Sequence, residues 1–350
     1  MNAIALSSAP SSPTVVSSAR TEAGRMQALV YTQYGPPEVV ALAEVPKPTP
    51  RDHEVLIRVR ATTVSTADWR ARTLAMPPGF GLMGRLFFGV FGPRKKVLGT
   101  ELAGEIESIG KAVTRFQVGD WVVAFTDVGF GAHAQYCVMP ETGAIVRKPA
   151  RLSVEQAAAM SFGATTALHF LRKGKIARGD KVLVVGASGA VGSAAVQLAR
   201  HFGADVTGVC RSANVELVRS LGAHRVIDYT QEDFTQNGET YDIILDATGS
   251  APLSRCERSL KPGGRLLIIL SASLAQSIGL AWPAKGSGKK AIAGVASVTA
   301  GDMEFLAGIA EAGAFVPVVD CVYPWERAAE AHARVETGRK RGSVVLTLGA

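Results

Sequence analysis

Short apolar runs of β-type, broken repeatedly by proline and glycine, characterise residues 26–148. The pattern predicts β-strands at 27–31, 54–61, 120–125 and 134–139. We therefore expect a compact, mostly β lobe in this part of the chain.

The pattern changes after Pro149. Apolar runs recur with helical stretches between them, and they begin near Lys181, Asp205, Arg225, Tyr241 and Arg265. Alternating β and α segments are typical of a parallel, doubly wound sheet. Residues 316–348 then return to strand-like runs around one helical stretch, 325–337, so we expect this end of the chain to rejoin the first lobe.

Composition is consistent with a two-domain globular protein. The 350 residues are 47% hydrophobic and 19% charged, unlike a disordered chain. The net charge of +8 would attract nucleic acid, an anionic membrane or a phosphorylated cofactor, and does not choose among them. Four widely spaced cysteines favour reduced thiols and a cytoplasmic location.

Two segments need a separate interpretation. Residues 1–25, rich in Ser, Ala and Pro, predict a disordered extension, and a transit peptide is the weaker alternative. Residues 266–284 carry no charge and are as long as a membrane span, but serines, Gly279 and Pro283 favour a strand followed by a loop.

The stretch KVLVVGASGAVGSAAVQLARHFGADVTGVC, residues 181–210, predicts a nucleotide-binding turn. It reads as a strand at 182–185, a glycine turn and a helix at 190–202. Relative to the G-x-G-x-x-G pattern, Ala187 replaces the first glycine and follows Gly186, while Gly189 would admit a pyrophosphate and Gly192 would let the helix pack closely. The helix N-terminus would face the phosphates. The predicted cofactor-binding residues are Gly186, Ala187, Ser188, Gly189, Ala190, Val191 and Gly192.

The end of the second strand of this unit carries Cys210, Arg211 and Ser212, where an NAD-binding site normally has an acidic residue. A guanidinium there would pair with a 2′-phosphate, so Arg211 and Ser212 predict NADPH as the cofactor. The alternative is a solvated surface arginine.

Several stretches together resemble the medium-chain dehydrogenase/reductase superfamily, in its quinone oxidoreductase or zeta-crystallin-like branch. They are EVLIRVRATTVSTADWR, LGTELAGEIESIG, FQVGDWVVAF, AHAQYCVM, AAAMSFGATTALHFL, GASGAVG and RGSVVLTL. The resemblance implies an α/β fold with a GroES-like catalytic domain formed by residues 26–148 and 316–350, and a Rossmann domain at 149–315. It also implies a homodimer, for which we expect a strand at 292–298 on the edge of the Rossmann sheet to form the contact.

The resemblance also implies individual site residues. Thr166 is expected near the nicotinamide and Ser271 along the bound cofactor. Ser65 and Asp68 fall where the quinone reductases carry an Asn and an Asp near the active site, so the contact made by the Asn is in doubt here.

The same comparison argues against zinc. The zinc-binding relatives place a Cys and a His where this chain has Ser65 and Thr100, and neutral hydroxyls are poor zinc ligands. Without a Lewis acid, we expect hydride transfer to a lipophilic quinone or enone, with Tyr34, Thr66 or water as proton donor. The alternatives are a zinc-free alcohol or aldehyde reductase and a nucleotide-dependent RNA-binding or structural protein, although no RNA-binding module stands out.

The insert at 76–97 combines many apolar side chains with Arg85, Arg94, Lys95 and Lys96. Three interpretations remain: a helix packed on the lobe with a solvated basic end, a lid over the substrate, or peripheral contact with a membrane.

Overall fold

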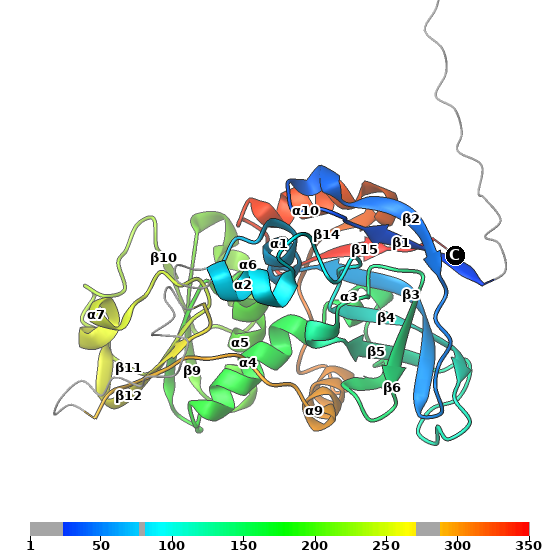
Figure 1. Cartoon of the computed structure of the whole chain (residues 1–350). Helices are drawn as coiled ribbons and strands as arrows, with labels where there is room; N and C mark the ends of the chain where they lie inside the picture. Colours follow the sequence, from blue (N-terminus) through cyan, green and yellow to red (C-terminus); the bar gives the residue numbers. More distant parts are fainter. Residues whose placement is uncertain (1–23, 77–80, 271–287, 350) are drawn as a thin grey trace, which may run out of the picture.

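The computed structural model describes residues 24–76, 81–270 and 288–349. Within these ranges the chain forms two large sheets that lie side by side, each with its own helices, and a small two-stranded sheet (Figure 1). The predictions for Ser271 and for all but the last two residues of 1–25 lie outside the described residues. Arg25 already belongs to the first strand, so that segment ends earlier than expected.

The first lobe contains a seven-stranded sheet in the order β14-β15-β3-β4-β5-β7, with β6 paired to β3, and a separate β1–β2 hairpin. The C-terminal strand β15 pairs antiparallel with β3, so both ends of the chain build this lobe, as expected. The strands are β1 (Arg25–Val30), β2 (Ala41–Pro46), β3 (Glu54–Val64), β4 (Glu101–Ile109), β5 (Trp121–Phe125), β6 (Tyr136–Pro140), β7 (Ile145–Arg147), β14 (Val319–Pro324) and β15 (Ser343–Thr347).

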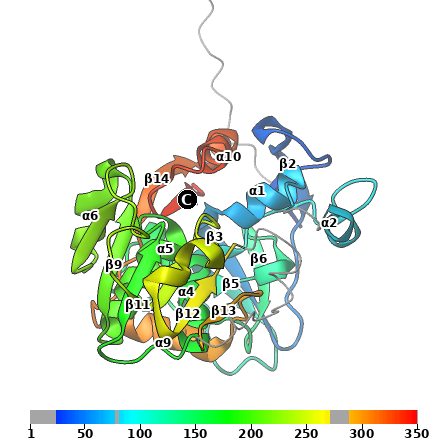
Figure 2. The same cartoon turned by 90° about the vertical axis from the view of Figure 1, so that its left-hand side faces the viewer.

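The helices of this lobe lie around the sheet (Figure 2). They are α1 (Thr66–Thr73), α2 (Gly81–Phe88), α3 (Val154–Ala158) and α10 (Ala328–Glu336), with 3-10 turns at Pro37–Val39, Asp127–Gly129 and Trp325–Arg327. Helix α2 forms within the 76–97 insert, but its apolar side chains are largely exposed. The structure thus places a helix in the insert, with apolar and basic groups both exposed, and the three interpretations of the insert remain predictions.

The second lobe confirms the predicted doubly wound sheet. Six parallel strands run in the order β10-β9-β8-β11-β12-β13. They are β8 (Lys181–Val185), β9 (Asp205–Cys210), β10 (Arg225–Asp228), β11 (Tyr241–Asp246), β12 (Leu260–Ile268) and β13 (Lys290–Ile292). The helices are α4 (Ser161–Lys173), α5 (Ala190–His201), α6 (Val215–Ser220), α7 (Leu253–Cys256) and α9 (Ala300–Glu311), with 3-10 turns at Ser212–Asn214 and Glu257–Ser259.

The strand predicted at 292–298 is mostly wrong. Strand β13 does lie at the sheet edge, but it ends at Ile292. Two residues later Gly294 has a φ of 134°, which is outside the extended region, and the next residue, Val295, is 88% exposed. Among the described residues no helix is long and apolar enough to cross a membrane.

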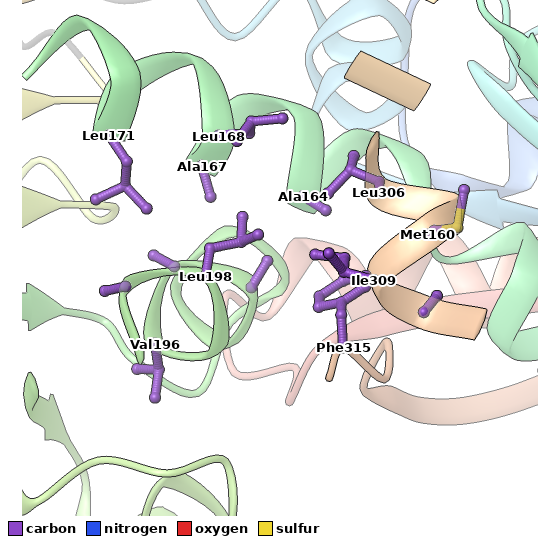
Figure 3. Packing of buried hydrophobic residues seen from close by; sticks show 14 of the residues in the cluster. Met160, Ala164, Ala167, Leu168, Leu171, Val196, Leu198, Leu306, Ile309 and Phe315 are labelled. Atoms are coloured by element: carbon purple, nitrogen blue, oxygen red, sulfur yellow. The ribbon is translucent and has the colours of Figure 1, made fainter. Parts of the chain in front are cut away.

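Close packing of α4 against α5 fixes the start of α5. Gly163 of α4 lies so near Ala190 that a Cβ on it would come within 2.5 Å of the Ala190 carbonyl oxygen. Small residues therefore permit this crossing, and larger apolar side chains surround it (Figure 3): Met160, Leu168, Leu171, Val196, Leu198, Leu306, Ile309 and Phe315. The N-terminus of α5 is thereby held at the boundary between the lobes.

Candidate active site and cofactor cleft

A cleft of about 680 Å³ lies between the two lobes. The glycine turn before α5, the end of β9 and Tyr229 directly after β10 line it from the second lobe, together with Ala247, Thr248 and Leu270. Residues 334–336 and 338–341, with Thr66 and Trp69 of α1, line it from the first lobe. The cleft therefore has the place expected of a ligand site at the carboxyl ends of parallel strands.

The glycine turn brings the start of α5 close to the end of β8. Gly186 turns the chain with a φ of 80°, and the amides of Gly186 and Ala187 donate to the Val209 carbonyl at 3.1 and 3.0 Å. A Cβ on Gly192 would lie 2.0 Å from the Gly186 carbonyl oxygen, so α5 can approach the turn only with glycine there. A Cβ on Gly189 would meet nothing nearer than 3.6 Å. Packing therefore does not require glycine at position 189. The absence of a side chain there leaves the space before the α5 amides open to an anion.

The predicted residues of the turn separate into two groups. Those that line the cleft are Gly186, Ser188, Gly189, Ala190, Val191 and Gly192. Ala187 is fully buried in the core of the second lobe, and a Cβ on Gly208 of β9 would lie 3.1 Å from its methyl group. Its side chain therefore packs beneath the turn.

Arg211 and Ser212 point to different surroundings. Arg211 lines the cleft, and its Nε donates to the hydroxyl of Tyr229 at 3.3 Å. Ser212 is not among the lining residues; its hydroxyl lies 3.1 Å from that of Thr230. Hydrogen bonds from Ser212 and Thr230 hold the pKa of Asp228, at the end of β10, below its ordinary value. Ser212 thus orders the neighbouring strand end.

The first lobe supplies cations that sequence reasoning missed. Arg334, Arg339, Lys340 and Arg341 line the cleft opposite Arg211. The amide of Gly342, directly after them, donates to the Ser188 carbonyl at 2.8 Å and so joins this segment to the glycine turn. The run RKR before the last strand was the available signal, but only the fold brings it to the turn.

Asp320 orders these cations from beneath. Its Oδ2 accepts from Nε of Arg334 at 2.8 Å, and its Oδ1 lies 3.5 Å from Nε of Arg341. Arg334 also donates to the carbonyl of Arg339 at 3.1 Å. Burial opposes ionisation of Asp320, but the hydrogen bonds from Arg334 and from the backbone of Arg341, together with the positive charge of Arg334, hold the pKa of this carboxyl below its ordinary value. The buried anion therefore connects three residues of the lining.

Ser65 and Asp68 form the N-terminal cap of α1. Asp68 is fully buried; its Oδ2 accepts from the amide and the hydroxyl of Ser65 at 2.7 and 2.6 Å, and its Oδ1 accepts from the Gly99 amide at 2.7 Å. The Ser65 oxygen in turn caps α1 at the Asp68 amide, as in a capping box. Neither residue lines the cleft, but Thr66 beside them does.

The remaining predicted residues are placed as follows. Thr166 is half-buried and its hydroxyl donates to the carbonyl of Phe162 at 2.7 Å; Phe162 lines the cleft, whereas Thr166 does not. Of the two named proton donors, Thr66 lines the cleft and Tyr34 donates to the carbonyl of Gly89 at 2.8 Å.

Glu101 joins the lobes behind the cleft. Its Oε2 accepts from the Phe162 amide at 2.6 Å and its Oε1 from the Thr63 hydroxyl at 2.5 Å. Burial raises the pKa of Glu101 to about 7, against the effect of these donors and of Lys340. Burial likewise lowers the pKa of Lys340 to about 8, against the charges of Glu101 and Asp320. The neighbouring Thr100 hydroxyl is buried without a partner among the described residues.

Known proteins agree with this architecture. Residues 51–150 match the family described as "Alcohol dehydrogenase GroES-like domain", and residues 221–346 match the one described as "Zinc-binding dehydrogenase". Within the described residues, no three His, Cys, Asp or Glu side chains are grouped as a metal site would require.

Similarity to individual proteins extends over nearly the whole chain. The chloroplast envelope quinone oxidoreductase homolog of Arabidopsis thaliana is 30% identical, over 92% of this chain and 98% of that protein. The NADPH-dependent alkenal/one oxidoreductase of the same plant is 29% identical, over 92% and 79%. The structure of the quinone oxidoreductase from Coxiella burnetii superposes with a TM-score of 0.81 at 26% identity, covering 93% of this chain and all of that one. The chain belongs to the medium-chain dehydrogenase/reductase superfamily, in its quinone oxidoreductase-like branch, with a GroES-like β domain and a Rossmann-like parallel sheet.

Proposed function

We propose that this oxidoreductase is NADPH-dependent and zinc-independent, and that it transfers a hydride to a quinone or an α,β-unsaturated carbonyl compound. The charge of the cleft carries the proposal: Arg211 faces Arg339, Lys340 and Arg341 across a glycine turn. Such groups bind the doubly charged 2′-phosphate of NADPH. Asp228, the carboxylate at the end of β10, does not line the cleft and accepts hydrogen bonds from Thr230.

The binding residues follow from the shape of the cleft. The open space at Gly189 and the first amides of α5 suit a pyrophosphate. Gly186 and residues 188–192 would surround the pyrophosphate. Arg211, supported by Tyr229, would hold the 2′-phosphate. When NADPH is bound, its nicotinamide supplies the hydride.

The acceptor class is supported by relatives and by the residues at the two zinc-ligand positions. The names of the relatives mention quinones and alkenals or enones. Ser65 and Thr100 offer only hydroxyls, which are weak zinc ligands, and the Ser65 hydroxyl already donates to Asp68. Negative charge that develops on the acceptor oxygen would then be stabilised by hydrogen-bond donors, and Thr66 is a hydroxyl that lines the cleft from the first lobe.

Ser65, Asp68 and Thr166 act as positioning residues in this proposal. The cap formed by Ser65 and Asp68 sets the start of α1, so that Thr66 faces the cleft. Thr166 ties its side chain to the carbonyl of Phe162, which lines the same space.

A substrate panel tests the proposal. Purified protein should oxidise NADPH faster than NADH at equal concentration, with quinones and 2-alkenals as acceptors, and treatment with a chelator should leave the rate unchanged. Activity restricted to simple aldehydes would assign it to alcohol or aldehyde reduction instead. Absence of turnover with every acceptor would overturn the proposal.

A further inference from the structure

Helix α2 presents an apolar surface to solvent. Leu82 and Phe87 are 75% and 54% exposed, Met83 and Leu86 are exposed beside them, and Phe91 in the following turn is completely exposed. Positions 82, 83, 86 and 87 share one face of a helix. The helix stands out from the side of the first lobe (Figure 2). A soluble monomer rarely leaves so many large apolar side chains together in water.

The other side of α2 contacts the rest of the first lobe at a few points. Gly84 is buried where a Cβ would lie 2.6 Å from Met76 Cγ. Phe88 meets the ring of Phe130 edge-on, with 6.3 Å between centroids. The Arg94 amide donates to the Phe88 carbonyl at 2.8 Å. The helix is therefore held with its apolar face outward.

Four exposed cations accompany the apolar face: Arg85, Arg94, Lys95 and Lys96. None of them forms an ion pair with another described residue, although most other arginines of the chain's described part do. A hollow of about 560 Å³ opens beside them, lined by Phe87, Val128 and Phe130 with Lys95 at its edge. It shares no lining residue with the cofactor cleft.

We propose that α2 and the turn through Lys96, which we call the α2 surface, dock on an anionic lipid membrane. Apolar side chains of an amphipathic helix enter the boundary between headgroups and acyl chains, which needs no matching shape in the partner. Unpaired lysines and arginines at the same level attract anionic headgroups. Both groups occur together here. Docking does not depend on the proposed function, because it uses none of the cofactor-binding residues.

The experiment is cosedimentation of the full chain with vesicles. We expect binding to vesicles that contain on the order of 30 mol% phosphatidylglycerol, weaker binding to phosphatidylcholine alone, and release as salt rises. Lys95→Glu with Lys96→Glu should lower the partition coefficient on anionic vesicles by about tenfold or more. Leu82→Ser with Phe91→Ser should lower it on both kinds of vesicle, because inserted apolar area is lost.

Matched controls use exposed residues elsewhere. Val118→Ser removes an exposed apolar side chain and Lys175→Glu reverses an exposed charge, and neither should change binding. Unchanged NADPH oxidation with a water-soluble quinone would show that the α2 variants are folded, and thermal melting would show it if no turnover is found. The proposal is overturned if the unmodified protein does not bind anionic vesicles at low salt, or if the α2 variants instead abolish self-association or binding to an acidic protein.

Discussion

The carboxylate of Asp320, only 3% exposed, accepts a hydrogen bond from Nε of Arg334 at 2.8 Å. The acid is buried under the cleft, and the arginine lines it. Through Arg341, which also approaches this carboxylate, the charge of one acid orders two cations on the wall opposite Arg211. A buried negative charge thus helps to position the cations that we propose to bind NADPH.

Asp320→Asn should raise the KM for NADPH by about tenfold and change kcat little, because a neutral amide holds the two arginines less firmly. The KM for NADH should change less than that for NADPH. Glu330→Gln, which removes a partner of Arg327 on the exposed side of the same lobe, is the matched control. Equal changes for both coenzymes would point to a general loss of packing and would contradict a positioning role.

Arg211→Ala should lower kcat/KM for NADPH by about tenfold or more and leave that for NADH within about twofold, since the lost contact involves only the 2′-phosphate. Steady-state kinetics measures kcat/KM for both coenzymes. Arg219→Ala removes an exposed arginine of α6 that pairs with Glu216, and should affect neither coenzyme. If NADPH and NADH were impaired alike, the 2′-phosphate would have to bind elsewhere.

Alanine at the two glycines of the turn should separate folding from binding. Gly189→Ala has room for its Cβ and should melt within about two degrees of the parent, while its methyl group narrows the space for phosphate and weakens NADPH binding. Gly192→Ala would place its Cβ 2.0 Å from the Gly186 carbonyl oxygen. This contact should lower the free energy of unfolding by about 3 kcal/mol or more. Thermal melting with and without NADPH tests both. A Gly189→Ala protein that binds normally would remove this glycine from the site.

Glu101→Gln should change the pH dependence of stability. Because burial raises its pKa from 4.5 to about 7, the folded protein retains this proton over a range in which the unfolded chain has lost it. The free energy of unfolding therefore decreases as pH rises through 4.5 to 7, and the variant lacks this decrease. As pH rises from 4.5 to 8, the free energy of unfolding of the variant should increase relative to that of the parent by up to about 3 kcal/mol.

Urea denaturation at several pH values measures this gain. Glu326→Gln, at an exposed acid, is the control. Parallel stability curves for the Glu101 variant and the parent would show that the carboxyl is not perturbed.

His332 should make the protein less stable in acid. Both its ring nitrogens are buried without partners among the described residues, and burial holds its pKa well below the ordinary value of 6.5. Below pH 6.5 the unfolded chain gains a proton that the folded protein does not accept, so the free energy of unfolding falls there. His332→Leu should lessen this fall between pH 6.5 and 5. Chemical denaturation over that range decides it, and an unchanged slope would refute the explanation.

Local patterns predicted much of the fold. The strand at Lys181, the turn after it and the helix at Ala190 follow from residues close together in the chain, whose apolar periodicity and glycine spacing act over a few positions. The same argument located five strands of the Rossmann sheet, β8 to β12, and strands β3, β5 and β6 of the first sheet, but not β4 or β7. It failed at 292–298, where Gly294 breaks the extended backbone.

Side-chain roles were harder to predict because they depend on distant partners. The resemblance to quinone reductases predicted Asp68 as an active-site acid. In the structure, however, the sheet brings the amide of Gly99 close, and this amide completes the hydrogen bonds of the Asp68 carboxylate. The sequence suggested Ser212 as a phosphate ligand, but Thr230, in the turn after β10, lies against its hydroxyl.

The sequence by itself determined the glycine turn, the arginine after β9, the alternation of strands and helices, and the hydroxyls at positions 65 and 100. Each depends on residue type and near neighbours. Only the tertiary structure decided that Arg339, Lys340 and Arg341, more than a hundred residues after the glycine turn, complete the cleft, and that Asp320 pairs with Arg334 and Arg341. The pairing of β15 with β3 and the hydrogen bond from Gly342 to Ser188 bring them there, and such long-range contacts leave no periodic signal in the chain.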